Sequence, residues 1–482
     1  MKARANAEAG AGAAARFDLL IAGATALTAD PARPCIDAAC IGVRDGRIAW
    51  IGDAPPAGAT ATRTLDGTGH VATPGFVNVH THSVLTLVRG VAADLGFAPS
   101  YTPGIPKASD LDDEQACALA RLGVMEALLA GSTVIGDHFT HADSTTAAVA
   151  DLGPRIAASW RILDVDFDRV ARSREWVHEP AIGQALLERG LALADRWAGH
   201  PRVTVQLAAH AADTCSDALL AQVARHAGQR QLRVNTHLGQ SQAEVERVRA
   251  RNGRTSTQVL EEAGLLNDRL IAGHCIYVTP DDAARLAAAG AHVAHIPKCN
   301  AASGRLAPLP MLRRAGLNIA LATDTQHGDM VELMRWALAT ARIQEGKVDD
   351  TWQPADVFHM ATQGGADALG LGHRLGSLTV GKDADIVLLD ASRPHWVPLT
   401  DPLGTLVHTG QGRDVRTVIV AGEIVVEQGR PLRADLSSLC EQAGRVARQV
   451  WDKARARNGG QEAGLRRPGR AGPDARLGLA GR

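Results

Sequence analysis

The sequence lacks a continuous apolar run of the ~18–20 residues that a membrane helix needs. It also lacks an excess of charge of one sign, because 51 basic and 52 acidic side chains leave a net charge of −1. That balance argues against nucleic acid or a membrane as a partner. The seven cysteines form no C-x-x-C pair, and the first sixteen residues lack the apolar core of a signal peptide. We therefore expect a reduced, cytoplasmic protein.

A glycine-rich phosphate loop is also missing, since Gly364-Gly365 and the pair Gly370 and Gly372 do not follow a strand at dinucleotide-binding spacing. The chain does have length and apolar content. It has 482 residues, of which 45% are hydrophobic and 21% are charged. These numbers allow one large domain with a sizeable core and a second, smaller domain.

The most informative motif is His80-Thr81-His82, which follows the apolar run 71–79. We expect this run to form one short buried strand, with both histidines just past its end. Residues i and i+2 of an extended chain point to the same side, so the two imidazoles would lie about 6–7 Å apart along the strand. That spacing lets them close on one metal ion, although an H-x-H pair alone also arises by chance.

Three further strand-like runs end in a potential ligand. Residues 232–236 lead into His237, residues 269–273 into His274, and residues 316–323 into Asp324. Together with the first run they give four strands with imidazole or carboxylate groups at their carboxyl ends. This arrangement is typical of the catalytic face of a (β/α)8 barrel.

The pattern of predicted elements changes twice along the chain. Short alternating runs, separated by turn residues such as Asp45-Gly46, predict β-hairpins before residue 72, and similar runs return at 384–390 and 416–422. Between them, strands alternate with helices, which predicts a parallel sheet. Helices are expected at 113–130, 216–227, 281–289, 329–342 and 436–456.

The expected fold is therefore α/β, a (β/α)8 TIM-like barrel with a small composite β-sandwich domain formed by both chain ends. The expected segments are a disordered N-terminal tail (1–16), a first β-sandwich segment (17–72), the barrel (73–372), a second β-sandwich segment (373–432), a C-terminal helix (433–458) and a disordered tail (459–482).

Several longer stretches resemble the amidohydrolase superfamily, and within it the branch of the triazine hydrolases and the adenosine-derivative, guanine and cytosine deaminases. They follow the family's order: TPGFVNVHTH (73–82), VRGVAADL (88–95), HAADTCSDALL (210–220), NTHLGQ (235–240), AGHCIYVTPDD (272–282), PLPMLRRAGLNIALATD (308–324) and GSLTVGKDADIVLLD (376–390). The resemblance implies the barrel with its composite sandwich, one divalent metal ion, and hydrolysis at an electrophilic carbon, usually with loss of ammonia.

The resemblance assigns the metal ligands residue by residue. His80, His82, His237 and Asp324 match the family's ligands. Such a set suits Zn²⁺, and Fe²⁺ or Mn²⁺ accept it too. The fourth predicted strand, 202–209, contains no lysine of the kind that the binuclear branch uses, so a mononuclear site is implied.

The same resemblance suggests catalytic and substrate-binding groups. Asp324 would also be the base that receives the proton of the metal-bound water, and His274 would contact that water or the substrate. His210 matches a histidine that commonly touches the substrate. His327, three residues after Asp324, lies on the same predicted catalytic-face loop and is a further candidate for substrate binding.

Two segments depart from the family pattern. Many deaminases of this branch have a glutamate three residues after the third ligand, where it protonates the ring nitrogen, but this chain has Gln240. An amide can only donate or accept hydrogen bonds, so Gln240 is expected to bind substrate without moving a proton. Loop 96–107 also differs from the Trp-containing segment of many relatives.

The leading prediction is a metal-dependent hydrolase that cleaves a non-peptide C–N bond of a small nitrogen heterocycle or amidine-like compound, by attack of a metal-activated hydroxide. An aminohydrolase (deaminase) is the default. Gln240 keeps open a ring-opening amidohydrolase, or a triazine-type hydrolase that displaces chloride or amine. The alternative from another class is a non-catalytic scaffold of this fold, but such proteins lose metal ligands that this chain keeps. The resemblance also implies a homo-oligomer.

Overall fold

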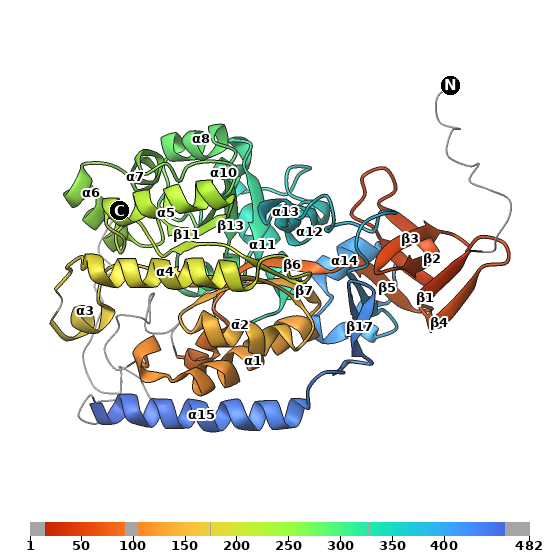
Figure 1. Ribbon diagram of the computed structural model, residues 1–482. Helices are drawn as coiled ribbons and strands as arrows, with labels where there is room; N and C mark the ends of the chain where they lie inside the picture. The colour runs from red at the N-terminus through yellow and green to blue at the C-terminus, as the bar shows by residue number, and fades with distance from the viewer. Residues whose placement is uncertain (1–14, 92–104, 174, 326, 458–482) are drawn as a thin grey trace, which may run out of the picture.

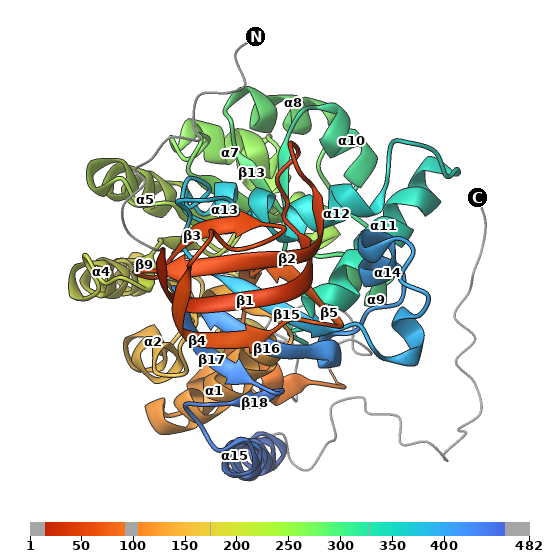
Figure 2. The same cartoon turned by 90° about the vertical axis from the view of Figure 1, so that its right-hand side faces the viewer.

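The computed structural model describes residues 15–91, 105–173, 175–325 and 327–457, and shows an α/β protein (Figure 1). Parallel strands form the centre of a body with helices on its outside, and a mixed sheet stands at one end. Figure 2 looks onto that sheet, where β1 (Arg16–Leu27) and β2 (Cys35–Arg44) cross in front of the body. The predicted tails and most of loop 96–107 lie outside the described residues, except that Arg16 already begins β1.

Both ends of the chain contribute strands to the mixed sheet. Its order is β18-β17-β16-β15-β5-β1-β2-β3, and β4 also pairs with β1. The other strands are β3 (Arg47–Gly52), β4 (Thr60–Asp66), β5 (His70–Pro74), β15 (Ile386–Asp390), β16 (Val415–Val420), β17 (Glu423–Glu427) and β18 (Arg430–Pro431). The antiparallel pair of β5 and β15, with Pro74 opposite Ile386, joins the contributions of the two chain ends. One face carries its own apolar core, which includes Leu19, Ile21 and Ile41.

The strands expected near both chain ends are confirmed. β2 and β3 form an antiparallel hairpin around Asp45-Gly46, and both turn residues have positive φ angles (51° and 72°). A two-residue turn of this kind matches the right-handed twist of the strands that it joins. The runs at 384–390 and 416–422 correspond to β15 and β16.

The apolar run 71–79 is divided rather than continuous. It forms most of β5 in the mixed sheet and the start of β6 (Phe76–Thr81) among the parallel strands. Gly75 separates the two strands, and a Cβ atom there would lie only 2.0 Å from Thr133 Oγ1. The prediction of one strand ending before both histidines was therefore wrong, because His80 lies within β6 and only His82 follows it.

The parallel strands form two sheets that are bonded to each other at both edges. The first has the order β10-β8-β7-β6, with β9 also beside β8, and the second has the order β11-β12-β13-β14. Their bounds are β7 (Ser132–Phe139), β8 (Arg155–Ile162), β9 (Val203–Val205), β10 (Ala208–Ala209), β11 (Val234–Leu238), β12 (Leu270–His274), β13 (His292–His295) and β14 (Asn318–Leu321). At one edge the backbone NH of His82 donates to Asp324 (2.8 Å), and at the other the NH of Leu207 donates to Arg233 (2.9 Å). Backbone pairing therefore continues from each sheet into the other.

The five expected helices are confirmed. They are α1 (Asp113–Leu129), α5 (Asp217–Arg230), α8 (Pro280–Ala288), α11 (Met330–Glu345) and α15 (Leu436–Arg457). Ser216 and Asp329, predicted as first helical residues, are instead the N-caps of α5 and α11, whose side chains accept backbone NH groups of the first turn. α15 lies along the body beside α1 (Figure 1), and Trp451 Nε1 donates to the backbone oxygen of Leu87 (2.8 Å).

The remaining described α-helices lie between these elements. They are α2 (Ala142–Ala150), α3 (Phe167–Ser173), α4 (Pro180–Arg196), α6 (Gln242–Asn252), α7 (Ser256–Glu262), α9 (Pro297–Ala302), α10 (Leu309–Arg314), α12 (Pro354–Ala361), α13 (Gln363–Ala368) and α14 (Pro402–His408). Short 3₁₀ helices occur at Ser83–Val88, Ala108–Asp110, Pro394–Trp396 and Gly412–Asp414. Within the described ranges, no helix combines the length and apolar character that a membrane span requires.

A buried ion pair ties the parallel strands to the segment that leads into β15. Arg155, at the start of β8, donates from Nε to Asp385 (3.0 Å) and from Nη2 to Asp383 (2.9 Å). Burial would lower the pKa of Arg155, but the two carboxylates raise it above its usual value. All three side chains are at most 7% exposed, so this contact links the parallel strands and the mixed sheet in a medium of low dielectric constant.

Replacing Arg155 with Met leaves the buried Asp385 carboxylate without its cation, whereas Asp383 keeps its ion pair with Arg374. Removing one partner of a buried pair costs about 3–5 kcal/mol, and we expect a clearly lower midpoint of urea unfolding. Arg445→Met is the matched control, because its pair with Glu441 on α15 is exposed and should contribute less than about 1 kcal/mol. Equal midpoints for the two variants would contradict a structural role for the buried pair.

Candidate metal centre

The four predicted ligands converge at the carboxyl ends of the parallel strands. His80 lies on β6 and His237 on β11, while His82 follows β6 and Asp324 follows β14. Their ligand atoms all lie within 4.8 Å of one another, and all four side chains are buried. Strands far apart in the chain therefore bring together the four groups that the sequence places at strand ends.

The imidazole Nε2 atoms face one another at short range. His82 Nε2 lies 3.3 Å from both His80 Nε2 and His237 Nε2, and 3.2 Å from Asp324 Oδ1. A single proton can bridge only one such nitrogen pair, so three nitrogens gathered around a carboxylate are better satisfied by a cation than by hydrogen bonds among themselves.

The opposite side of each ligand ring is fixed by an oxygen acceptor. The Nδ1 atom of each histidine donates a hydrogen bond: His80 to Asn235 Oδ1 (2.7 Å), His82 to the backbone oxygen of His138, and His237 to the backbone oxygen of His210 (2.7 Å). With the proton held on Nδ1, each neutral ring keeps its Nε2 lone pair for a metal. Three such nitrogens and one carboxylate are a donor set that fits Zn²⁺.

The site also favours the protonation states that metal binding requires. Burial and the neighbouring His82 lower the pKa of His80 to about 3, and burial holds the pKa of His237 well below its usual value. Burial alone would raise the pKa of Asp324, but the hydrogen bond with His82 and the nearby His274 lower it. At neutral pH His80 and His237 are therefore neutral and the Asp324 carboxylate is ionised.

Asn235 supports the centre without being a ligand itself. Its side chain is fully buried on β11, accepts from His80 and donates to the backbone oxygen of Val79 (3.2 Å). We expect Asn235→Leu to weaken metal affinity about 10–100-fold, the usual effect of removing a group that orients a ligand. Competition with a chelator measures this change. Asn267→Leu, before β12, is the control, and equal affinities would contradict the assigned role.

His274 lies beside the ligands, as predicted, in an unusual backbone conformation. Its ring stacks on that of His237 with centroids 5.4 Å apart, and its Nδ1 donates to Asn300 Oδ1 (2.9 Å). His274 and Asp324 both have left-handed φ angles (67° and 61°). Residues with a Cβ atom rarely adopt this region, and such strain is concentrated at functional sites.

His210 and His327 also lie next to the ligands. The His210 ring is 4.8 Å from that of His237, and its Nδ1 bonds to Thr214 Oγ1 (2.8 Å). His327 lines a cavity of about 10 Å³ together with His82 and Asp324. Both nitrogens of His327 are buried and have no hydrogen-bond partner among the described residues. The substrate contacts of His210 and His327 stay predictions.

Gln240 lies on the loop that follows β11. Its backbone NH donates to Glu244 Oε2 (2.8 Å), and the NH of Gly239 donates to Glu244 Oε1 (2.9 Å). Within the described residues, no hydrogen bond is formed by the half-buried Gln240 amide. The loop is therefore fixed through its backbone, while the amide stays available.

Two residues near the centre had no firm assignment from sequence. His138 on β7 packs with ring centroids 5.2 and 5.1 Å from His80 and His82, and its buried nitrogens have no partner among the described residues. Cys299 Sγ donates to Asp324 Oδ2 (3.1 Å). His138 lies near the carboxyl end of a strand, which is a signal of a site residue, whereas nothing in the local sequence marks Cys299.

The loop residues after β13 are held by other side chains. Lys298 forms an ion pair with Glu332 (2.7 Å). The Oδ1 atom of Asn300 accepts a hydrogen bond from His274 Nδ1. The side chains of both residues therefore bind other side chains of the protein.

The sequence of this chain is similar to those of known enzymes. The model of the amidohydrolase family matches residues 71–425, most of the chain. The chain belongs to the amidohydrolase family. This amidohydrolase is 33% identical to a 5-methylthioadenosine/S-adenosylhomocysteine deaminase of Syntrophobacter fumaroxidans, with 90% of this chain and 99% of that protein covered. It is 30% identical to a 5'-deoxyadenosine deaminase of Methanosarcina acetivorans, with 91% and 100% covered.

Two solved structures share the fold of this chain. An adenosine deaminase from Xanthomonas campestris with bound zinc superposes with a TM-score of 0.82 at 28% identity, covering 92% of this chain and 100% of that one. An atrazine chlorohydrolase from Arthrobacter aurescens complexed with zinc gives a TM-score of 0.80 at 24% identity, covering 89% and 100%, and supports the fold alone. The chain is thus a metal-dependent hydrolase of non-peptide C–N bonds, as predicted, and the expectation of one divalent ion, with Zn²⁺ favoured, is confirmed.

Proposed function

We propose that this amidohydrolase removes the 6-amino group of an adenine nucleoside that is modified at its 5′ carbon. Water adds to the carbon that bears the amino group, ammonia leaves, and the ring keeps an oxo group. The observation that carries this proposal is the buried His80, His82, His237 and Asp324 cluster in a chain that aligns with relatives named for such nucleosides over nearly their full length.

The barrel and the composite β-sandwich belong to the proposal. We infer that β6 to β14 close into a (β/α)8 barrel over residues 73–372, in which β9 and β10 are two pieces of the fourth strand. The backbone bonds at both sheet edges support closure. Residues 17–72 and 373–432 would form the sandwich, and 433–458 the C-terminal helix. The chemistry would then take place at the carboxyl ends of the strands.

The cluster offers defined roles to its residues. His80, His82, His237 and Asp324 would hold one divalent ion, which supplies hydroxide at neutral pH by lowering the pKa of its water. Asp324 is ionised, and its Oδ2 faces Cys299 rather than the ligand histidines, so it can accept the proton of the attacking water.

The neighbouring groups would serve the substrate. His274 is held by Asn300 and kept neutral by burial, so it can orient the attacking water or assist the departing amine. His210 lies beside His237, His327 follows Asp324 and Gln240 follows β11, and all three would contact the heterocycle. The two imidazoles could form hydrogen bonds with the ring nitrogens of a purine, and the Gln240 amide could donate a further hydrogen bond to it.

The proton for the ring nitrogen needs a source, because position 240 is a glutamine. Asp329 and Glu332, on the segment after Asp324, are two carboxylates that could take the place of a glutamate at position 240. Asp329 caps α11 and accepts the NH of Gly412 (3.1 Å), while Glu332 is paired with Lys298. Glu244 accepts two loop NH groups and is only 3% exposed. We infer that this proton would come from the metal-bound water, relayed by His274 or His210. A ring-opening reaction, or a displacement of chloride or amine, that needs no such proton is the second candidate.

The zinc-loaded protein should release ammonia from 5'-deoxyadenosine or 5-methylthioadenosine faster than from adenosine, guanine or cytosine. Gln240→Glu should raise the weak activity on adenosine, and also turnover of the two proposed substrates because they carry the same adenine ring, since a positioned acid contributes about 10²–10⁴-fold. Ammonia release and ring absorbance, followed together, measure the substrate preference and the effect of Gln240→Glu, and they also detect ring opening. Gln242→Glu, an exposed change on α6, is the control. Adenosine turnover by the unmodified protein at a kcat/KM of about 10⁵ M⁻¹s⁻¹ or more would refute the role of Gln240.

We also propose a reduced, cytoplasmic homo-oligomer. All seven cysteines are free in the structure, which agrees with a reducing compartment. Trp336 and Ile343, seven residues apart on α11, are exposed (38% and 72%) on one helix face and offer an apolar surface for a second copy. Light scattering at micromolar concentration tests this, and a monodisperse monomer would refute it.

A further inference from the structure

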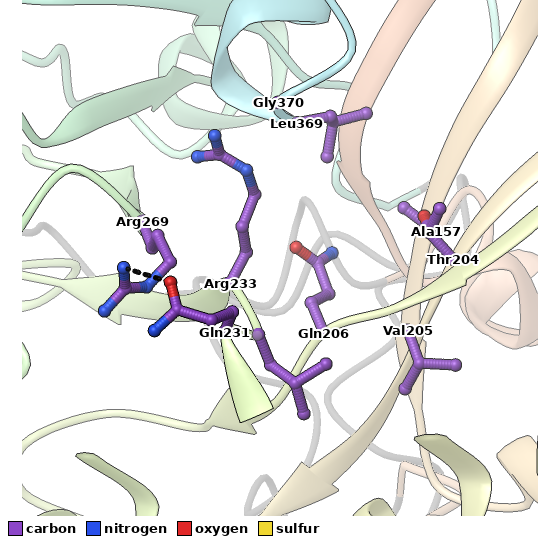
Figure 3. A pocket seen from close by; sticks show the side chains of 10 residues that line it. Ala157, Thr204, Val205, Gln206, Gln231, Arg233, Arg269, Leu369 and Gly370 are labelled. Atoms are coloured by element: carbon purple, nitrogen blue, oxygen red, sulfur yellow. Dashed lines mark hydrogen bonds between the residues drawn. The ribbon is translucent and has the colours of Figure 1, made fainter. Parts of the chain in front are cut away.

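A second pocket of about 310 Å³ lies at the amino ends of the parallel strands, away from the metal ligands (Figure 3). Arg233 and Arg269 directly precede β11 and β12, and Gln206 lies between β9 and β10. The other lining residues are Ala157, Thr204, Val205, Gln231, Leu232, Leu369 and Gly370. The pocket has no role in the hydrolysis described above.

The pocket and the metal centre nevertheless share strands. Arg233 and His237 are four residues apart on β11 and its lead-in. Because the two residues are separated by an even number of positions, they lie on the same face of the strand, about 13 Å apart. A ligand that orders Arg233 would therefore act on the strand that carries a metal ligand.

Two guanidinium groups give the pocket cationic character. Arg233 Nη1 donates to the backbone oxygen of Asp268 (3.1 Å), and Arg269 Nη1 donates to Gln231 Oε1 (3.3 Å), the dashed bond in Figure 3. Burial lowers the pKa of Arg233, and the nearby Arg269 lowers it further against the attraction of Asp268. Asp268 is 76% exposed, so water screens its charge and an anion in the pocket would offset the repulsion between the arginines.

Gln206 supplies an independent sign of a ligand. Its side chain is 3% exposed, and neither Nε2 nor Oε1 has a hydrogen-bond partner among the described residues. Figure 3 shows this amide in the middle of the lining residues, between Arg233 and Thr204. Buried amides are nearly always paired, so a group that both accepts and donates hydrogen bonds is expected here.

We propose that this pocket binds a phosphate group, as inorganic phosphate or as a small phosphomonoester. Its oxygens can accept from the two guanidinium groups and from Gln206 Nε2, with the strength of charge-assisted bonds. Hydrogen phosphate also keeps an O–H at neutral pH, which can donate to Gln206 Oε1. Sulfate has the same shape but no such donor, so the amide distinguishes the two anions.

Thermal unfolding and calorimetric titration of the zinc-loaded full chain test this proposal. At constant ionic strength, inorganic phosphate should raise the unfolding midpoint saturably, and sulfate should raise it less. A larger response to glycerol 3-phosphate than to inorganic phosphate would identify a monoester as the ligand. Arg233→Met and Gln206→Leu should each weaken phosphate affinity about tenfold or more, as expected for one lost charge-assisted bond. The exposed Arg225→Met is the matched control.

A further variant separates the pocket from the metal centre. Phosphate binding should persist in His237→Ala, which removes a metal ligand. Loss of binding in His237→Ala with retention in Arg233→Met would overturn the proposal, as would the absence of any saturable response. If Arg233→Met does not fold, Arg269→Met, at a side chain that is 28% exposed, provides the same test. The outcome does not depend on which nucleoside the enzyme uses.

Discussion

Asp324→Asn is expected to lower kcat by about 10²–10⁴-fold, the usual contribution of a general base. The amide has nearly the same shape as the carboxylate but cannot accept the proton of the attacking water. The buried hydrogen bonds of Asp324 to His82 and Cys299 show how closely the carboxylate is held at this position. Steady-state ammonia release, measured with the zinc content of each preparation, gives the effect per metal-loaded site.

Asp329→Asn is the matched control for this substitution. Asp329 lies on the same segment, but its Oδ1 accepts backbone NH groups at the start of α11, a role that the amide oxygen of an asparagine can also fill. Only the contact of Oδ2 with the NH of Gly412, far from the metal ligands in the chain, would be lost. We expect kcat close to that of the unmodified protein. A similar loss in both variants, or near-normal turnover of zinc-loaded Asp324→Asn, would contradict the assignment of Asp324 as the base.

His237→Ala should abolish both metal binding and activity. The unmodified protein should copurify with about one zinc ion per chain, whereas the variant should retain almost none, because three ligands remain and a buried gap replaces the fourth. Metal analysis after gel filtration measures this directly. His274→Ala is the contrasting variant: it should lose turnover and keep most of its metal. Two tightly bound ions at full occupancy would refute the mononuclear site.

The ligand set could be predicted because its signals are local. Each ligand follows or ends an apolar run, and parallel strands place their carboxyl ends together whatever lies between them in the chain. His80, His82, His237 and Asp324 therefore meet in the structure as the sequence indicated. The helices could also be predicted from the sequence, because their caps and their 3.6-residue periodicity depend on residues that are close together in the chain.

Features that depend on distant contacts could not be predicted. The division of run 71–79 at Gly75 results from the close approach of Thr133 on another strand. The acceptors that fix the ligand rings are backbone oxygens of His138 and His210, which no side-chain pattern reveals. The left-handed backbone at His274 is likewise imposed by the surrounding structure rather than by its own residue type.

The order of synthesis gives the mixed sheet a particular vulnerability. β5 ends at Pro74, but its antiparallel neighbour β15 begins only at Ile386. Roughly 300 residues must be translated between the two, which takes about 15–60 s at 5–20 residues per second. Throughout that interval β5 presents an unpaired edge, which is a template for pairing with other chains. Nascent chains released before β15 emerges should therefore aggregate, and a ribosome-bound chaperone has its longest opportunity to act on the first strands of this protein.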